Sequence, residues 1–132
     1  MEATLSVTVS ADSIDEFARV SGDCSPVHID DEQARREGFA GRIAHGGLLV
    51  AYVSQLIGVK LPGPGWILHS LSMEYRQPVY PGDTVTILGR VKSFSEGVGL
   101  LTLKIEVAGG DSQLIATGMV RSIFRGVVPA TE

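Results

Sequence analysis

An aspartate and a histidine lie five residues apart in the segment Gly22–Asp30, on either side of a proline. Pro26 fixes its own φ angle and biases Ser25 towards extended geometry, which predicts a stiff, non-helical span that carries Asp23 and His28. A carboxylate beside an imidazole can position a water molecule and remove a proton from it. Either residue alone is more often an ordinary loop residue, so the hypothesis of an acid–base pair rests on their combination.

A second segment, Ala44–Gly47, stands at the start of a long apolar stretch. The first N–H groups of a helix have no partner within the helix and lie at the positive end of its dipole, and glycine lets a ligand approach them closely. Gly46 and Gly47 could therefore bind a substrate carbonyl oxygen. The simpler alternative is that the two glycines only permit close packing of the helix against a sheet. For His45 we predict a structural role, in which it holds the loop by a hydrogen bond.

Composition and charge narrow the range of functions. The 132 residues include 11 Lys plus Arg against 15 Asp plus Glu, and this net charge of −4 argues against nucleic acid as the main partner. Cys24 is the single cysteine, so neither an internal disulfide nor a cysteine-based zinc site can form, and we expect no metal site and a cytoplasmic location. The first residues lack the pattern of a signal peptide, and the longest apolar stretch, residues 46–59, is shorter than a bilayer requires, so we expect no membrane partner.

The spacing of apolar residues predicts strands and helices in a definite order. Alternation over residues 4–9 indicates a strand, and apolar residues three and four positions apart indicate a helix over about residues 11–20. A short helix is expected over residues 31–36, where acidic residues stand at its start. Further alternation predicts four antiparallel strands, at about residues 69–76, 84–92, 101–107 and 114–124.

Residues 46–59 form the central element of the predicted fold. Apolar side chains lie in nearly every direction around this helix, so it must be surrounded by protein. The order of elements predicts an α+β fold: one domain over residues 1–132, with a strongly curved five-stranded antiparallel sheet wrapped around the long helix. His69 and Trp66 are expected in its core. A single sheet of this kind leaves an edge strand and an apolar flank uncovered, so we expect a homodimer.

Three segments together resemble a known family: Asp23–Asp30, Ala44–Gly47 and Gln77–Asp83. They are similar to the MaoC-like branch of the hotdog fold, in particular to the (R)-specific enoyl-CoA hydratases. The likeness runs from about Ser10 to Arg125. In this fold the long helix lies inside the curved sheet, as the order of elements already predicts.

The resemblance implies a reaction and a role for each residue. The substrate would be trans-2-enoyl-CoA, a coenzyme A thioester, with its carbonyl on the N–H of Gly46, helped by that of Gly47. Water held between Asp23 and His28 would add to C3 while a proton is delivered to C2, giving (R)-3-hydroxyacyl-CoA without a cofactor. Which of the two residues is the acid and which is the base stays open. The residues that orient the loop would be Ser25, Pro26 and His45.

Two positions depart from the family, and other functions stay open. Ser25 stands where the motif commonly has Asn, and Ala51 stands where related hydratases can carry Ser. One alternative is dehydration of a 3-hydroxyacyl group on acyl carrier protein, which needs the same pair and the same carbonyl site. A hotdog thioesterase fits less well, because residues 48–53 include no Asp or Glu. The last alternative is a noncatalytic acyl-binding module.

Overall fold

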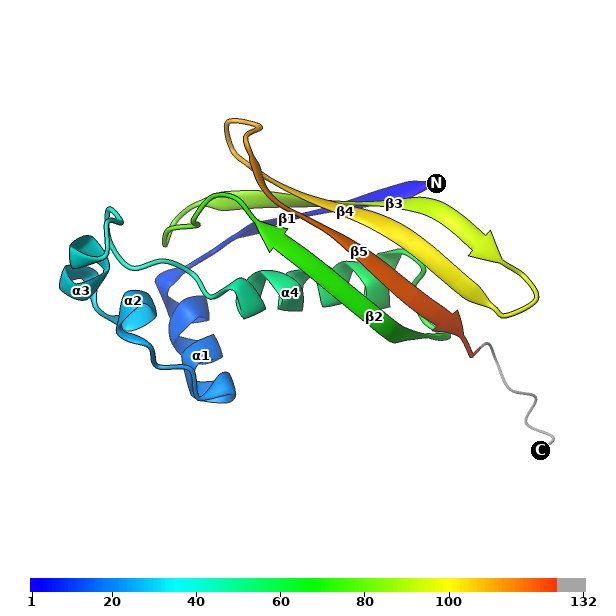
Figure 1. The fold of residues 1–132 in the computed structure, drawn as a ribbon, viewed down its shortest axis with the longest axis horizontal. Coiled ribbons are helices and arrows are strands. Elements are labelled where there is room, and N and C mark those ends of the chain that lie inside the picture. Colours follow the sequence, from blue (N-terminus) through cyan, green and yellow to red (C-terminus); the bar gives the residue numbers. More distant parts are fainter. Residues whose placement is uncertain (126–132) are drawn as a thin grey trace.

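The computed structural model describes residues 1–125, which form five strands and a group of helices (Figure 1). In chain order the elements are β1 (Glu2–Thr8), α1 (Ala11–Ser21), α2 (Pro26–Ile29), α3 (Asp31–Arg36), α4 (Gly46–Gln55), η1 (Leu56–Lys60), β2 (Trp66–Tyr75), β3 (Thr84–Ser95), β4 (Leu100–Gly109) and β5 (Leu114–Phe124). Among the helices of this range, none has both the length and the apolar character that a membrane crossing needs. Residues 126–132 of the predicted domain lie outside the described residues.

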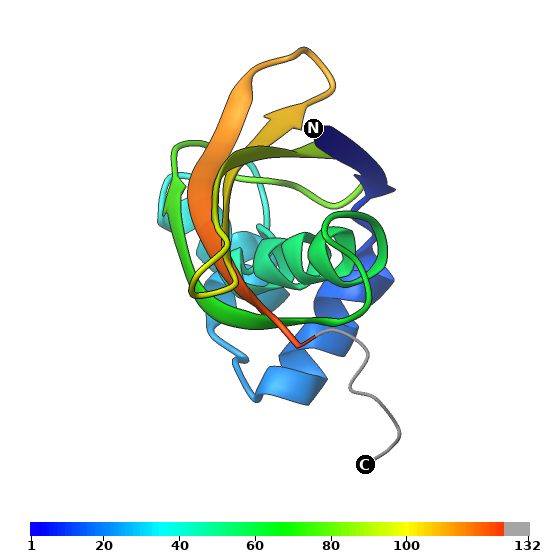
Figure 2. The ribbon, with the colours of Figure 1, turned by 90° about the vertical axis from the view of Figure 1, so that its right-hand side faces the viewer.

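The five strands form one antiparallel sheet in the order β1-β3-β4-β5-β2. The sheet curls around α4, and β1 and β2 are its two edges (Figure 2). Its inner face alternates along β4 as the sequence predicts, because Leu103, Ile105 and Val107 are fully buried while Lys104 is exposed. The predicted α+β fold, with a curved sheet around one long helix, is confirmed.

The central helix α4 is buried on one side only. Leu49 and Val53 of α4 pack into the core, and Leu56 does so in η1, a single π-helical turn that continues the helix. The opposite side, with Ala51 and Ser54, is exposed. The prediction that protein surrounds this helix on every side is therefore wrong for residues 1–125 of a single chain. The reason is geometric, because a curved sheet still leaves one side of the helix open.

Two further local predictions are wrong. Residues Pro26–Ile29 form the short helix α2, although the sequence predicts a non-helical span there. Pro26 begins this helix, where its missing N–H costs no hydrogen bond and its fixed φ angle suits the helix. His69 is exposed instead of buried, because it lies with the exposed Ile67 and Leu68 on an uncovered part of the edge strand β2. Trp66, also predicted in the core, is half-buried and packs against it.

The caps of the short helices direct the chain towards the start of α4, where α1, α2 and α3 gather (Figure 1). Ser10 caps α1 with its side-chain oxygen, and Gly22 ends α1 in left-handed geometry with a φ of 77°. Asp30 caps α3 in the same way as Ser10 caps α1. The turn between α1 and α2 is then held against α4 by a hydrogen bond between Asp23 and His45.

Candidate active site

Asp23 lies in the turn that follows α1, and Ser25 fixes its side chain. The Ser25 N–H donates to Asp23 Oδ1 over 3.1 Å, and the Ser25 hydroxyl donates to the same oxygen over 2.6 Å. The hydroxyl and, to a lesser extent, the N–H hold the pKa of Asp23 below its ordinary range. The other carboxylate oxygen, Oδ2, faces the ring of His28.

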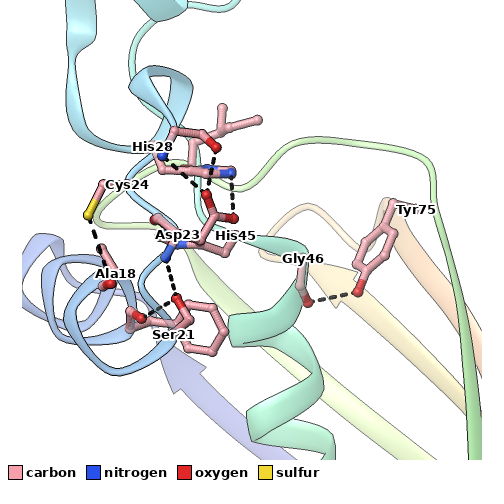
Figure 3. Close-up of polar contacts among 11 residues, drawn as sticks. Ala18, Ser21, Asp23, Cys24, His28, His45, Gly46 and Tyr75 are labelled. Carbon is pink, nitrogen blue, oxygen red and sulfur yellow. Dashed lines mark hydrogen bonds and ion pairs between the residues drawn. The ribbon is translucent and has the colours of Figure 1, made fainter.

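The ring of His28 is oriented by a main-chain carbonyl. Its Nδ1 lies 2.8 Å from the carbonyl oxygen of Ile43, and a carbonyl can only accept, so the neutral ring carries its proton on Nδ1. Nε2 is then unprotonated, and it lies 4.0 Å from Asp23 Oδ2 (Figure 3). If a water oxygen lies about 2.8 Å from each of these two atoms, the angle between the two contacts at the water is roughly 90°. This angle is close to the one between the O–H bonds of water. The gap therefore fits one water molecule that donates to both residues.

His45 ties the Asp23 turn to the start of α4. Its Nε2 lies 2.9 Å from the carbonyl oxygen of Asp23, its exposed fraction is 2%, and its ring stacks on that of His28 at 3.9 Å between centroids. Its Nδ1 has no hydrogen-bond partner within residues 1–125. The structure thus brings Ser25, Pro26 and His45 around the Asp23–His28 pair, and their roles in orienting the loop stay predictions.

Asp23, His28 and His45 also form the one group of metal-ligand type found within the described residues, with ligand atoms within 4.8 Å of one another. An imidazole binds a metal through a lone pair in the plane of its ring. The two rings are stacked, with 24° between their planes, so their lone pairs cannot converge on one ion. The arrangement suits a hydrogen-bonded pair better than a metal site.

Gly46 and Gly47 begin α4, and both explanations offered by the sequence have a basis in the structure. His45, the residue before them, provides no side-chain cap, so the first N–H groups of the helix have no side-chain acceptor there. A Cβ at Gly46 would lie 2.8 Å from Cζ of Tyr75, and a Cβ at Gly47 would lie 2.6 Å from Cζ of Phe17. A side chain at either position would therefore displace an aromatic ring, of Tyr75 at Gly46 and of Phe17 at Gly47.

A cavity of about 370 Å³ opens beside His28 and Gly46. Its walls are mainly apolar, and they include Gln77, Pro78 and Val79 of the third segment that the sequence singled out. Asp23 and Gly47 are not among the lining residues. The cavity therefore gives a ligand access to His28 and to the first residue of α4.

Tyr75 is a residue of this site that the sequence did not single out. It lines the cavity, and its hydroxyl donates to the carbonyl oxygen of Gly46 over 2.7 Å (Figure 3). Burial raises the pKa of this hydroxyl. In the sequence Tyr75 only ends an alternating strand pattern, which gives no signal for a contact with a residue so distant along the chain.

The family model described as MaoC like domain matches residues 1–120. The chain belongs to the MaoC-like domain family. This match confirms the resemblance carried by the three sequence segments. A solved structure, the (R)-hydratase from Aeromonas caviae involved in PHA biosynthesis, has a TM-score of 0.89 and 32% identity, and 94% of each chain is covered. This likeness confirms the hotdog fold of the MaoC-like chain.

Curated relatives of this MaoC-like chain are named as hydratases and dehydratases. An (R)-specific enoyl-CoA hydratase from Aeromonas caviae is 34% identical over 117 residues, which are 89% of this chain and 87% of that protein. An (R)-specific enoyl-CoA hydratase from Rhodospirillum rubrum is 42% identical over 84 residues, or 64% of this chain and 58% of that protein. A mitochondrial 3-hydroxyacyl-[acyl-carrier-protein] dehydratase from Arabidopsis thaliana is 38% identical over 86 residues, or 65% of this chain and 49% of that protein. The chain spans less than two thirds of the last two relatives.

The two departures from the family pattern have different consequences in this MaoC-like chain. Ser25, the first of these departures, donates twice to Asp23 Oδ1, so its side chain fixes the Asp23 carboxylate. Ala51 lies on the exposed side of α4, away from the buried residues of the helix. Only the first departure touches the Asp23–His28 pair directly.

Replacing Ser25 with Ala should raise the pKa of Asp23 towards its ordinary value, because the hydroxyl contact is lost while the N–H contact is kept. The Ser25–Asp23 contact stabilises the fold above the pKa of an unfolded aspartate, and this stabilisation is lost as the pH falls through the lower folded pKa. A titration of the Asp23 carboxyl followed by ¹³C NMR measures the shift. Ser13→Ala, which removes a hydroxyl bonded to Ser10 instead, is the control and should leave this pKa unchanged. An unchanged pKa of Asp23 in Ser25→Ala would show that the Ser25 hydroxyl is not the cause of the lowered pKa.

Proposed function

We propose that this MaoC-like chain is an (R)-specific enoyl-CoA hydratase, which adds water across the C2=C3 bond of trans-2-enoyl-CoA to give (R)-3-hydroxyacyl-CoA. The observation that carries the proposal is the 4.0 Å separation between Asp23 Oδ2 and His28 Nε2, beside an apolar cavity. The names of the relatives support a hydro-lyase activity of this kind.

Asp23 and His28 form the proposed acid–base pair. The lowered pKa of Asp23 keeps its carboxylate ionised at neutral pH, and Nε2 of the neutral His28 ring can accept a hydrogen bond. A water molecule that donates to both is left with a lone pair to attack C3. One residue of the pair takes a proton from the water as the O–C3 bond forms, and C2 receives a proton from the pair. Both protons of the added water end in the product, so the pair returns to its starting state and no cofactor is consumed.

The first N–H groups of α4 form the proposed site for the thioester carbonyl. Hydrogen bonds from Gly46 and Gly47 would draw electron density away from C3 and stabilise the enolate that develops as water adds. The positive end of the helix dipole favours the same charge. Because the cavity reaches Gly46 and not Gly47, Gly46 is the main donor in this proposal.

The second candidate function is dehydration of a 3-hydroxyacyl group on acyl carrier protein, which the likeness to the Arabidopsis dehydratase favours. It uses the same pair and the same carbonyl site in the reverse direction. A thioesterase or a noncatalytic acyl-binding module has less support, because neither needs the Asp23–His28 pair.

Coenzyme A and acyl carrier protein thioesters with the same acyl chain, assayed side by side, would distinguish the carriers. A cytoplasmic location, expected from the single cysteine, belongs to the same proposal.

Asp23→Ala and His28→Ala should each lower the turnover of crotonyl-CoA by about a hundredfold to ten-thousandfold, because general acid–base catalysis contributes this much. The loss of absorbance of the enoyl thioester measures the rate, and circular dichroism checks the fold. Asp12→Ala and His69→Ala remove the same residue types at exposed positions outside the site, and both should keep the normal rate. Normal turnover in either Asp23→Ala or His28→Ala would contradict the assignment of these two residues as the acid–base pair.

Gly46→Pro removes the N–H proposed to bind the carbonyl, at a helix position that accepts proline. Any side chain at this position meets the Tyr75 ring, so Gly46→Ala is the control, since it adds a Cβ and keeps the N–H. We expect kcat to be about a hundredfold lower in Gly46→Pro than in Gly46→Ala, the loss found when one carbonyl-binding donor is removed. Equal kcat values in the two folded variants would exclude this N–H as the donor.

We also propose that the chain forms a homodimer. The edge strand β2 leaves Ile67 56% exposed and Leu68 48% exposed, and one side of α4 is uncovered. Light scattering after gel filtration should give twice the chain mass of 14.0 kDa. Ile67→Asp should shift the protein towards the monomer, whereas Val20→Asp, at an exposed position of α1, should not. A single-chain mass for the unaltered protein at assay concentration would refute the dimer.

A further inference from the structure

Arg42 lies between α3 and α4, and its side chain is only 15% exposed. One guanidinium nitrogen, Nη1, donates to Asp15 of α1 over 2.7 Å and also lies 3.4 Å from the carbonyl oxygen of His28. The other, Nη2, lies 3.5 Å from the carbonyl oxygen of Ala11. A single sheltered cation therefore connects α1 to the residue that carries the imidazole of the proposed acid–base pair.

The main chain at Arg42 and Ile43 forms hydrogen bonds with residues on either side of His28. The Arg42 N–H donates to Asp31 Oδ1 over 2.8 Å, and the Ile43 N–H donates to the carbonyl oxygen of Val27 over 3.1 Å. The carbonyl of Ile43 is the acceptor that orients the His28 ring. A displacement of Arg42 would therefore move both the main chain of His28 and the acceptor of its Nδ1.

The ion pair between Arg42 and Asp15 differs from the exposed pairs on the surface. In the pair of Arg36 with Glu32 the side chains are 68% and 76% exposed, and such pairs contribute little to stability. The Arg42 side chain is only 15% exposed, although that of Asp15 is 55% exposed, and Nη1 of Arg42 also lies 3.4 Å from the carbonyl oxygen of His28. The hydrogen bond from Arg42 also holds the pKa of Asp15 below its ordinary range.

We propose that Arg42 and Asp15 are positioning residues that set the location and the tautomer of His28. Arg42 acts through the His28 carbonyl and through the neighbouring Ile43 carbonyl, and Asp15 acts by fixing the guanidinium. Neither residue lines the cavity. The proposal rests on the proposed function in one respect, since it takes His28 as a member of the acid–base pair.

Kinetics of crotonyl-CoA hydration test the effect on catalysis. Arg42→Gln and Asp15→Asn should each lower kcat by about tenfold to a hundredfold, the cost of a small misplacement of a catalytic group. KM should stay within about twofold, because neither residue touches the substrate. The double variant should be no slower than Arg42→Gln, and Arg42→Lys should recover part of the rate. Arg36→Gln, which removes an exposed arginine, is the matched control and should keep the normal kcat.

The ¹⁵N NMR signals of the His28 ring provide a second readout that does not depend on activity. In the unaltered protein the neutral ring should carry its proton on Nδ1, and in Arg42→Gln and Asp15→Asn the other tautomer should increase. If the unaltered protein does not hydrate crotonyl-CoA but the variants still shift the His28 tautomer, the proposed function is rejected. The positioning role of Arg42 and Asp15 is then still supported.

Normal kcat and an unchanged His28 tautomer in folded Arg42→Gln would overturn the proposal. If the decreases in kcat of the two single variants add up in the double variant, the proposal is also contradicted. Residues that act as one unit should give no further decrease once one of them has been replaced. If Arg42→Gln does not fold, Asp15→Asn and Arg42→Lys decide the question by the same two readouts.

Discussion

Two hydrogen bonds between histidine rings and main-chain carbonyls hold the candidate site together. His45 binds the carbonyl of Asp23, and His28 binds the carbonyl of Ile43, so the turn after α1 and the helix α2 are both fastened to the segment that enters α4. Because a carbonyl only accepts, the same bonds fix which nitrogen of each neutral ring carries the proton. The location and the protonation of the Asp23–His28 pair therefore depend on one small set of contacts.

These bonds fix the position of Asp23 and His28 relative to α4, and the sheet holds α4 itself in place. Leu49, Val53 and Leu56 are buried in the core together with the inner faces of the strands, so the axis of the helix cannot shift without opening packed apolar surface. The start of α4 consequently stays at one end of the sheet, beside the cavity and the three short helices. The fold thus brings a helix terminus and an Asp–His pair to the same cavity, although they come from different parts of the chain.

The sequence predicts the elements and the pair but not the contacts that orient the pair. Alternation along β4 and the apolar character of α4 are local patterns, and Asp23 and His28 stand close together around Pro26, so all of these could be read directly. The bond between Arg42 and Asp15 joins distant parts of the chain, and no periodicity encodes such a contact. The two wrong predictions on helices have related causes: a proline suits the first helical position as well as an extended span, and burial of α4 depends on what the sheet leaves open.

The glycines at the start of α4 show why packing and carbonyl binding are not competing explanations. The missing Cβ of Gly46 lets the Tyr75 ring approach the helix, and Gly46 also lines the cavity. The hydroxyl of Tyr75 donates to the carbonyl of Gly46, which shares one peptide group with the N–H of Gly47. Donation to the carbonyl oxygen polarises that group and makes its N–H a stronger donor. Tyr75, which packs against Gly46, therefore also strengthens the N–H of Gly47, the second donor of the proposed carbonyl site.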